Sequence, residues 1–162
     1  MSAFDRGLAR TVLRDPVHWL AFGLGTGLSP VAPGTVGSLL GVALAWATLP
    51  LGTGAQILVA IALMLSGIAI CGVSARRIGV HDHSGIVWDE IAAMYAVLIM
   101  APDGVIGWTA AFLLFRLFDI WKPWPIRDLD HSMRGGLGIM LDDIIAALYA
   151  ALLLGLWGRL TT

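Results

Sequence analysis

The sequence is poor in charge, in cysteine and in the motifs of zinc enzymes. Charged residues make up only 13% of its 162 residues, whereas a soluble domain is about a quarter charged. The net charge of −1 excludes a strongly basic nucleic-acid binder, and the single cysteine excludes a disulfide scaffold. Neither HExxH nor CxxC occurs, which argues against zinc. With 58% hydrophobic residues and a mean hydropathy of +0.85, the composition indicates an integral membrane protein.

Five apolar runs, separated by turn residues, account for most of the chain. They cover about 36–49, 55–73, 86–101, 105–121 and 139–157. At about 20 residues per span, the chain has room for one domain, 1–162, with four to five apolar helices. Within it, segment 1–16 has arginines four residues apart and is expected to form an amphipathic helix on the membrane surface. The expected fold is therefore all-α, a polytopic membrane bundle.

Residues 17–38 interrupt this helical pattern with five glycines and two prolines. The segment is expected to form a re-entrant or irregular loop, which a membrane tolerates only inside protein or beside water. Its backbone N–H groups, together with a helix starting near Val36, would suit a phosphate. The alternative is a flexible turn that binds nothing. The candidate phosphate-binding residues are Ser29, Gly34, Thr35 and Ser38.

Three polar sets lie near the ends of apolar runs. They are Asp89 with Glu90, Arg116 with Asp119, and Asp142 with Asp143. Since a charge in hydrocarbon costs roughly 3 kcal/mol or more, these carboxylates need partners, and carboxylate clusters with few histidines favour Mg²⁺. Two alternatives stay open: the acids cap soluble helices, or Arg116 and Asp119 only form an ion pair.

The distribution of lysine and arginine predicts on which side these acids lie. Apart from Arg116, inside an apolar run, and Arg159, the basic residues lie in the N-terminal segment and in the connections 74–85 and 122–138. The positive-inside rule places these parts in the cytoplasm. All three polar sets then lie near the cytoplasmic headgroup level, because a helix rises only about 1.5 Å per residue.

Four sequence blocks resemble the bacterial phosphatidylglycerophosphatase A family. They are GLGTGLSPVAPGTVGS (23–38), GVHDHSGIVWDE (79–90), FRLFDIWKPWPIRDLD (115–130) and GGLGIMLDD (135–143). The resemblance implies an all-helical enzyme of the bacterial inner membrane, with its active site on the cytoplasmic side. This phosphoric monoester hydrolase would convert phosphatidylglycerophosphate to phosphatidylglycerol during phospholipid biosynthesis, and would require Mg²⁺.

The residues predict a division of roles. The expected Mg²⁺ ligands are Asp89, Glu90, Asp142 and Asp143, with Asp82 or Asp119 nearby. The groups expected to neutralise the phosphate are Arg116, Lys122 and Arg127. Asp82 or Glu90 would accept the proton of the attacking water, although a covalent aspartyl-phosphate is equally compatible with the sequence. The acyl chains would stay in the bilayer. The competing classes are a small transporter or channel and a non-catalytic membrane subunit.

Overall fold

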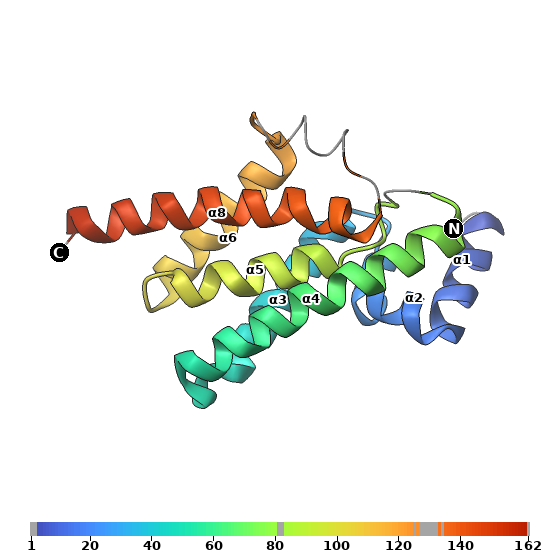
Figure 1. Ribbon diagram of the computed structural model, residues 1–162, viewed down its shortest axis with the longest axis horizontal. Coiled ribbons are helices and arrows are strands. Elements are labelled where there is room, and N and C mark those ends of the chain that lie inside the picture. Colours follow the sequence, from blue (N-terminus) through green and yellow to red (C-terminus); the bar gives the residue numbers. More distant parts are fainter. Residues whose placement is uncertain (1–2, 81–82, 125, 127–132, 134, 162) are drawn as a thin grey trace.

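The chain folds into helices that lie side by side along the molecule, with the two termini at opposite ends (Figure 1). The computed structural model describes residues 3–80, 83–124, 126, 133 and 135–161. No β-strand occurs in these ranges, which confirms the expected all-α class. The elements are α1 (Ala3–Arg14), α2 (Pro16–Ala21), η1 (Gly23–Leu28), α3 (Pro33–Thr48), η2 (Leu49–Leu51), α4 (Gly52–Ile78), α5 (Trp88–Met100), α6 (Val105–Trp121) and α8 (Gly136–Thr161).

The central helix is α5. It packs against α3, α4, α6 and α8, and eight of its 13 residues are buried. Two hydrogen bonds hold it in place: the Tyr95 hydroxyl lies 2.9 Å from that of Thr48 on α3, and Trp88 Nε1 donates to the Leu63 carbonyl of α4 at 3.0 Å. Polar residues on α5 are therefore surrounded by protein rather than by lipid.

Three helices of the described residues are long and apolar enough to cross a membrane. They span Pro33–Leu51, Thr53–Ile78 and Gly136–Arg159. The sequence led us to expect four to five such helices, and the difference lies in α5 and α6. These have 13 and 17 residues, or about 20 and 26 Å of helix, against a hydrocarbon core of about 30 Å.

The N-terminal region is more helical than expected. The amphipathic helix is present as α1, and Asp15 caps α2 by accepting a 2.8 Å hydrogen bond from the Val17 N–H. Irregular backbone is confined to η1, where Leu24 has a positive φ, and to the turn before α3. Because Ala32 adopts a left-handed conformation (φ 45°) and Pro33 follows at the first helical position, α3 begins three residues before Val36.

Glycines allow close helix contacts around α5 and between α4 and α8. A Cβ on Gly41 of α3 would lie 2.8 Å from the Ile91 carbonyl oxygen of α5. A Cβ on Gly136 of α8 would lie 1.8 Å from the Ile68 carbonyl oxygen of α4. Small residues at such crossings let helix backbones approach, as is usual in membrane bundles. These contacts fix the positions of the starts of α5 and α8 relative to their neighbours.

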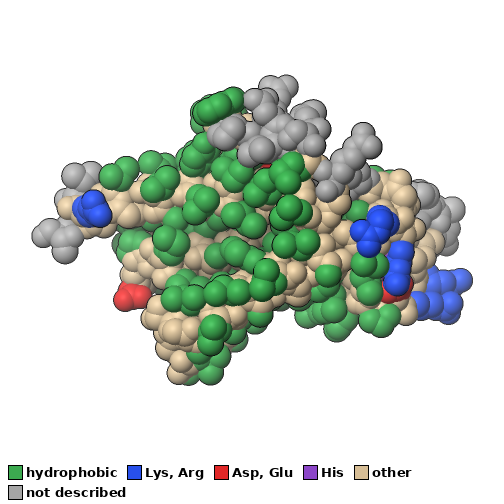
Figure 2. Space-filling model, viewed as in Figure 1, with side chains coloured by type: hydrophobic (Ala, Val, Ile, Leu, Met, Phe, Trp, Pro, Cys, Tyr) green, Lys and Arg blue, Asp and Glu red, His purple; other side chains and the backbone are tan. Residues whose placement is uncertain are grey.

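Much of the face in view is apolar, and most of its basic side chains lie at the end of the molecule that holds α1, with another at the C-terminal end (Figure 2). Exposed residues of this basic end include Arg10 and Arg14 of α1 and Arg76 and Arg77 of α4. The Arg77 guanidinium pairs with Asp15 at 2.5 Å, joining the end of α4 to the start of α2. The starts of α3, α5 and α8 point toward this same end (Figure 1).

Candidate active site

Three carboxylates from two helices meet near the basic end of the bundle. Asp89 and Glu90 lie in the first turn of α5, and Asp143 lies two turns into α8. One oxygen of each lies within 4.8 Å of the other two. Asp89 and Asp143 are only 7% and 3% exposed. The expected meeting of acids from separate helices is confirmed for these three residues, which we call the carboxylate cluster.

Helix capping does not account for the cluster. No side-chain hydrogen bond caps α5, although its first turn does favour acids through the helix dipole. Asp143 lies beyond the first turn of α8, where that effect has faded. In the part of the chain that the structure describes, Asp89 Oδ1, Glu90 Oε2 and Asp143 Oδ2 are buried without a hydrogen-bond partner. Such oxygens are costly to bury and are suited to bind a cation.

The segment 83–87, which leads into α5, is held by backbone contacts with η1 and α2. The Val87 N–H donates to the Ala21 carbonyl at 2.9 Å. A Cβ on Gly27 would lie 2.0 Å from the Gly85 carbonyl oxygen, so no larger residue fits there. Two of the blocks noted in the sequence thus pack on each other, and together they determine where Asp89 and Glu90 lie.

An ion pair on α6 borders the cluster. Arg116 Nη1 donates to the Asp119 carboxylate, as the three-residue spacing predicts. The same nitrogen lies 3.4 Å from the Ser38 hydroxyl of α3. Asp119 in turn lies beside Asp143. The pair therefore joins α3, α6 and α8 around the cluster, and is more than an isolated contact within one helix.

The predicted phosphate-binding residues of the Gly/Pro segment do not form one loop. Gly34, Thr35 and Ser38 belong to the first turns of α3, and the Ser38 hydroxyl donates to the Gly34 carbonyl at 2.8 Å. Ser29 lies in the preceding turn, where its hydroxyl donates to the Val31 carbonyl. Gly34 packs directly on Glu90, since a Cβ there would lie 2.2 Å from Glu90 Oε1. The absence of a side chain at Gly34 therefore leaves room for the Glu90 carboxylate.

Asp142 occupies a different position from its neighbour Asp143. Lys122 Nζ donates to Asp142 Oδ2 at 2.6 Å, and Asp142 is not one of the three carboxylates whose oxygens converge. Adjacent helical residues point about 100° apart, which explains the separation. α6 ends at Trp121, and the left-handed backbone of the next residue, Lys122 (φ 45°), turns the chain away from the helix. Two further predicted residues, Asp82 and Arg127, lie outside the described residues.

The charges around the cluster fit a divalent cation. Among the described residues, two basic groups, Arg116 and Lys122, face five carboxylates, so three negative charges are in excess when all are ionised. One oxygen from each of Asp89, Glu90 and Asp143 lies within 4.8 Å of the other two, so the three carboxylates are close enough to share one ion. The acidic cluster can therefore hold a metal ion, with hard oxygen ligands of the type that Mg²⁺ or Ca²⁺ prefers.

The chain is similar to bacterial proteins of one family over most of its length. Residues 19–157 match the family model described as phosphatidylglycerophosphatase A. The protein of that name from Escherichia coli (strain K12) is 42% identical over 148 residues, covering 91% of this chain and 86% of its own. Its namesake from Haemophilus influenzae is 44% identical over 147 residues, covering 90% of each. No solved structure matches the chain significantly. The chain belongs to the phosphatidylglycerophosphatase A family.

Proposed function

We propose that this protein hydrolyses phosphatidylglycerophosphate to phosphatidylglycerol and phosphate with the help of Mg²⁺. The names of its relatives support the reaction. The observation that carries the proposal is the buried cluster of Asp89, Glu90 and Asp143, with its unpartnered oxygens. The whole chain, 1–162, would act as a single membrane domain built around α5.

We also propose that the site faces the cytoplasm at the inner membrane of a bacterium. The cluster lies at the starts of α5 and α8, near the end of the molecule that carries Arg10, Arg14, Arg76 and Arg77. Clustered basic residues stay on the cytoplasmic side and are attracted to anionic lipid headgroups. The lipid headgroup would then reach the cluster while its acyl chains stay in the bilayer.

In this proposal Asp89, Glu90 and Asp143 hold the Mg²⁺. When bound there, the ion would supply positive charge to the phosphate oxygens and would make water a better nucleophile. Arg116 and Lys122 neutralise further phosphate charge, and Asp142 positions Lys122 through their 2.6 Å contact. Ser38 orients Arg116 from the α3 side. Glu90 is one candidate to accept the proton of the attacking water, and Asp82 is the other.

Purified protein in detergent tests the proposal directly. We expect phosphate release from phosphatidylglycerophosphate with Mg²⁺, loss of that release with EDTA, and recovery when excess Mg²⁺ is restored. Parallel assays with Ca²⁺ test metal identity, and parallel assays with phosphatidic acid test the need for the glycerol headgroup. Failure to release phosphate from either lipid, with the helical content intact, contradicts the proposal.

Replacing Gly34 by alanine is expected to lower phosphate release by about 100-fold, the scale seen when a reacting group is misplaced by about 1 Å. The new Cβ would displace Glu90 Oε1 from a position 2.2 Å away. That atom ends a flexible side chain, so the fold should persist, and alanine is the better helix former. The melting temperature is therefore expected to stay level or rise.

The matched control is Gly54→Ala in α4, where a Cβ meets nothing within 4 Å. It should leave phosphate release unchanged. Release by Gly34→Ala within about twofold of the control would mean that the position of Glu90 does not matter for the reaction.

A further inference from the structure

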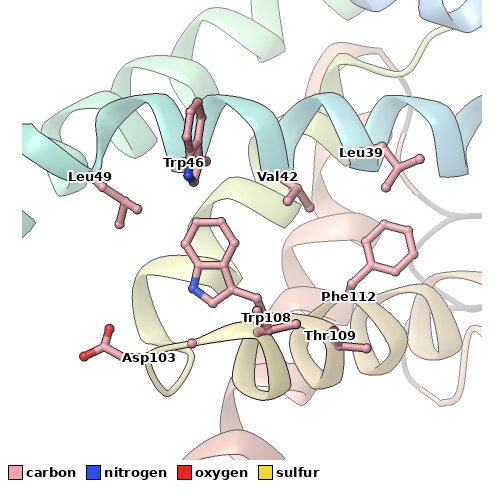
Figure 3. A pocket seen from close by; sticks show the side chains of 10 residues that line it. Leu39, Val42, Trp46, Leu49, Asp103, Trp108, Thr109 and Phe112 are labelled. Atoms are coloured by element: carbon pink, nitrogen blue, oxygen red, sulfur yellow. The ribbon is translucent and has the colours of Figure 1, made fainter.

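An apolar groove runs between α3 and α6 (Figure 3). Its volume is about 500 Å³, within the usual range of about 300–1,000 Å³ for small-molecule sites. The side chains that line most of it are Leu39, Val42 and Trp46 of α3 and Trp108, Thr109 and Phe112 of α6. Figure 3 shows Trp108 and Phe112 turned from α6 toward α3.

The groove runs along α3 and α6, the two helices that carry Ser38 and Arg116 beside the carboxylate cluster. On α6, Arg116 lies one turn after Phe112, on the same helix face. On α3, Ser38 precedes Leu39 and lies one turn before Val42. The 3.4 Å contact between Arg116 and the Ser38 hydroxyl joins the helices at this end of the groove. A polar site for the headgroup and an apolar channel thus follow one another along α3 and α6.

The dimensions and chemistry of the groove suit one hydrocarbon chain. From Leu39 to Leu49 the groove extends over ten residues of α3 and η2, or about 15 Å, which is half of the roughly 30 Å hydrocarbon core. Its one charged lining residue, Asp103, lies at the same end of the groove as Leu49, away from the cluster. The Trp46 side chain is 70% exposed, so the groove is open on this side to the lipid around the bundle.

We propose that this groove binds one acyl chain of the phospholipid substrate, an inference that rests on the proposed lipid phosphatase function. Binding the chain here directs the attached phosphate toward Arg116 and the carboxylate cluster. The groove thereby sets a preference for long-chain lipids over short-chain or deacylated phosphate esters. The competing occupants are unselected bilayer lipid and a helix of a second copy of this protein.

The test compares Thr109→Trp with the unaltered protein on two substrates in the same detergent. These are dioleoyl phosphatidylglycerophosphate and its water-soluble dihexanoyl analogue. Thr109 is exposed on the α6 wall, so tryptophan narrows the groove without entering the core. We expect KM for the dioleoyl lipid to rise about 10-fold, the scale of a steric mismatch in an apolar pocket, and kcat/KM for the dihexanoyl lipid to change less than about twofold.

Two further variants test whether the effect is specific to the groove. Val42→Trp narrows the groove from α3 and should give the same split between substrates. Leu65→Trp places the same side chain on the exposed face of α4 and should leave hydrolysis of both substrates unaffected.

An unchanged KM for the dioleoyl lipid in both groove variants would overturn the inference and leave only unselected lipid in the groove. An equal loss on both substrates, or an altered oligomeric state on size-exclusion chromatography, would overturn it as well. Absence of hydrolysis of either lipid by the unaltered protein would instead contradict the proposed function.

Discussion

Replacing Asp143 by asparagine lowers phosphate release by at least about 100-fold, the scale on which preorganised charge contributes to catalysis, and it leaves the chain folded. Asparagine has the same shape, but it removes one of the three anionic ligands from the cluster. The melting temperature of the metal-free protein should rise, because fewer like charges then face each other in a buried space. Asp89→Asn should behave in the same way.

Thermal unfolding with added Mg²⁺ separates loss of binding from loss of chemistry. A ligand at 100 times its Kd stabilises the folded state by about 2.7 kcal/mol, so Mg²⁺ should raise the melting temperature of the unaltered protein. Asp143→Asn should lose most of that rise. If this variant kept both near-normal turnover and the full Mg²⁺ shift, the cluster would not be the metal site.

Two other acids are controls for the same measurements. Asp103, exposed in the turn before α6 and away from the cluster, should keep the full Mg²⁺ shift when it is replaced by asparagine. Asp142→Asn should lower phosphate release by about 10-fold, in the range seen for residues that orient a functional group, yet keep the Mg²⁺ shift, since it pairs with Lys122 at 2.6 Å. If Asp142→Asn lost the Mg²⁺-dependent rise in melting temperature, Asp142 would be a metal ligand, as expected from the sequence.

The two acidic pairs show how far the sequence can locate this site. Acids at the edges of apolar runs predicted that α5 and α8 would bring carboxylates together, because isolated charges are costly there. The sequence pattern could not show that Asp89 and Glu90 both join the cluster, whereas only Asp143 of the second pair does. That depends on the rotation of α8 about its axis, and its hydrophobic positions do not specify that rotation.

The prediction of an irregular loop up to residue 38 was wrong at the start of α3. Glycine and proline usually mark a loop, yet Gly34 and Gly37 lie inside a regular helix. Their small size is required by neighbours distant in the sequence: Glu90 lies against Gly34, and Val87 lies against Gly37. The long apolar runs, by contrast, form helices because of their own composition and length. The sequence therefore located the long helices well. The α3–α6 groove depends on tertiary contacts alone, and no pattern along the chain indicated it.

Replacing Gly136 by alanine is expected to cause the largest loss of stability, about 4 kcal/mol or more, a size reserved for severe packing faults. Its Cβ would lie 1.8 Å from the Ile68 carbonyl oxygen and 2.8 Å from the Gly72 nitrogen. Both contacts are backbone atoms, so no side-chain rotation relieves them, and α4 and α8 must move apart. Thermal unfolding in detergent measures the effect.

The matched control lies in the same helix. A Cβ on Gly155 meets nothing within 4 Å, so Gly155→Ala should stabilise the protein by up to about 1 kcal/mol through helix propensity alone. Gly136→Ala should also lower phosphate release in whatever protein remains folded, because Asp143 lies seven residues, or two turns, further along α8 and moves with it. Equal melting temperatures for the two variants would show that α4 and α8 do not cross at Gly136.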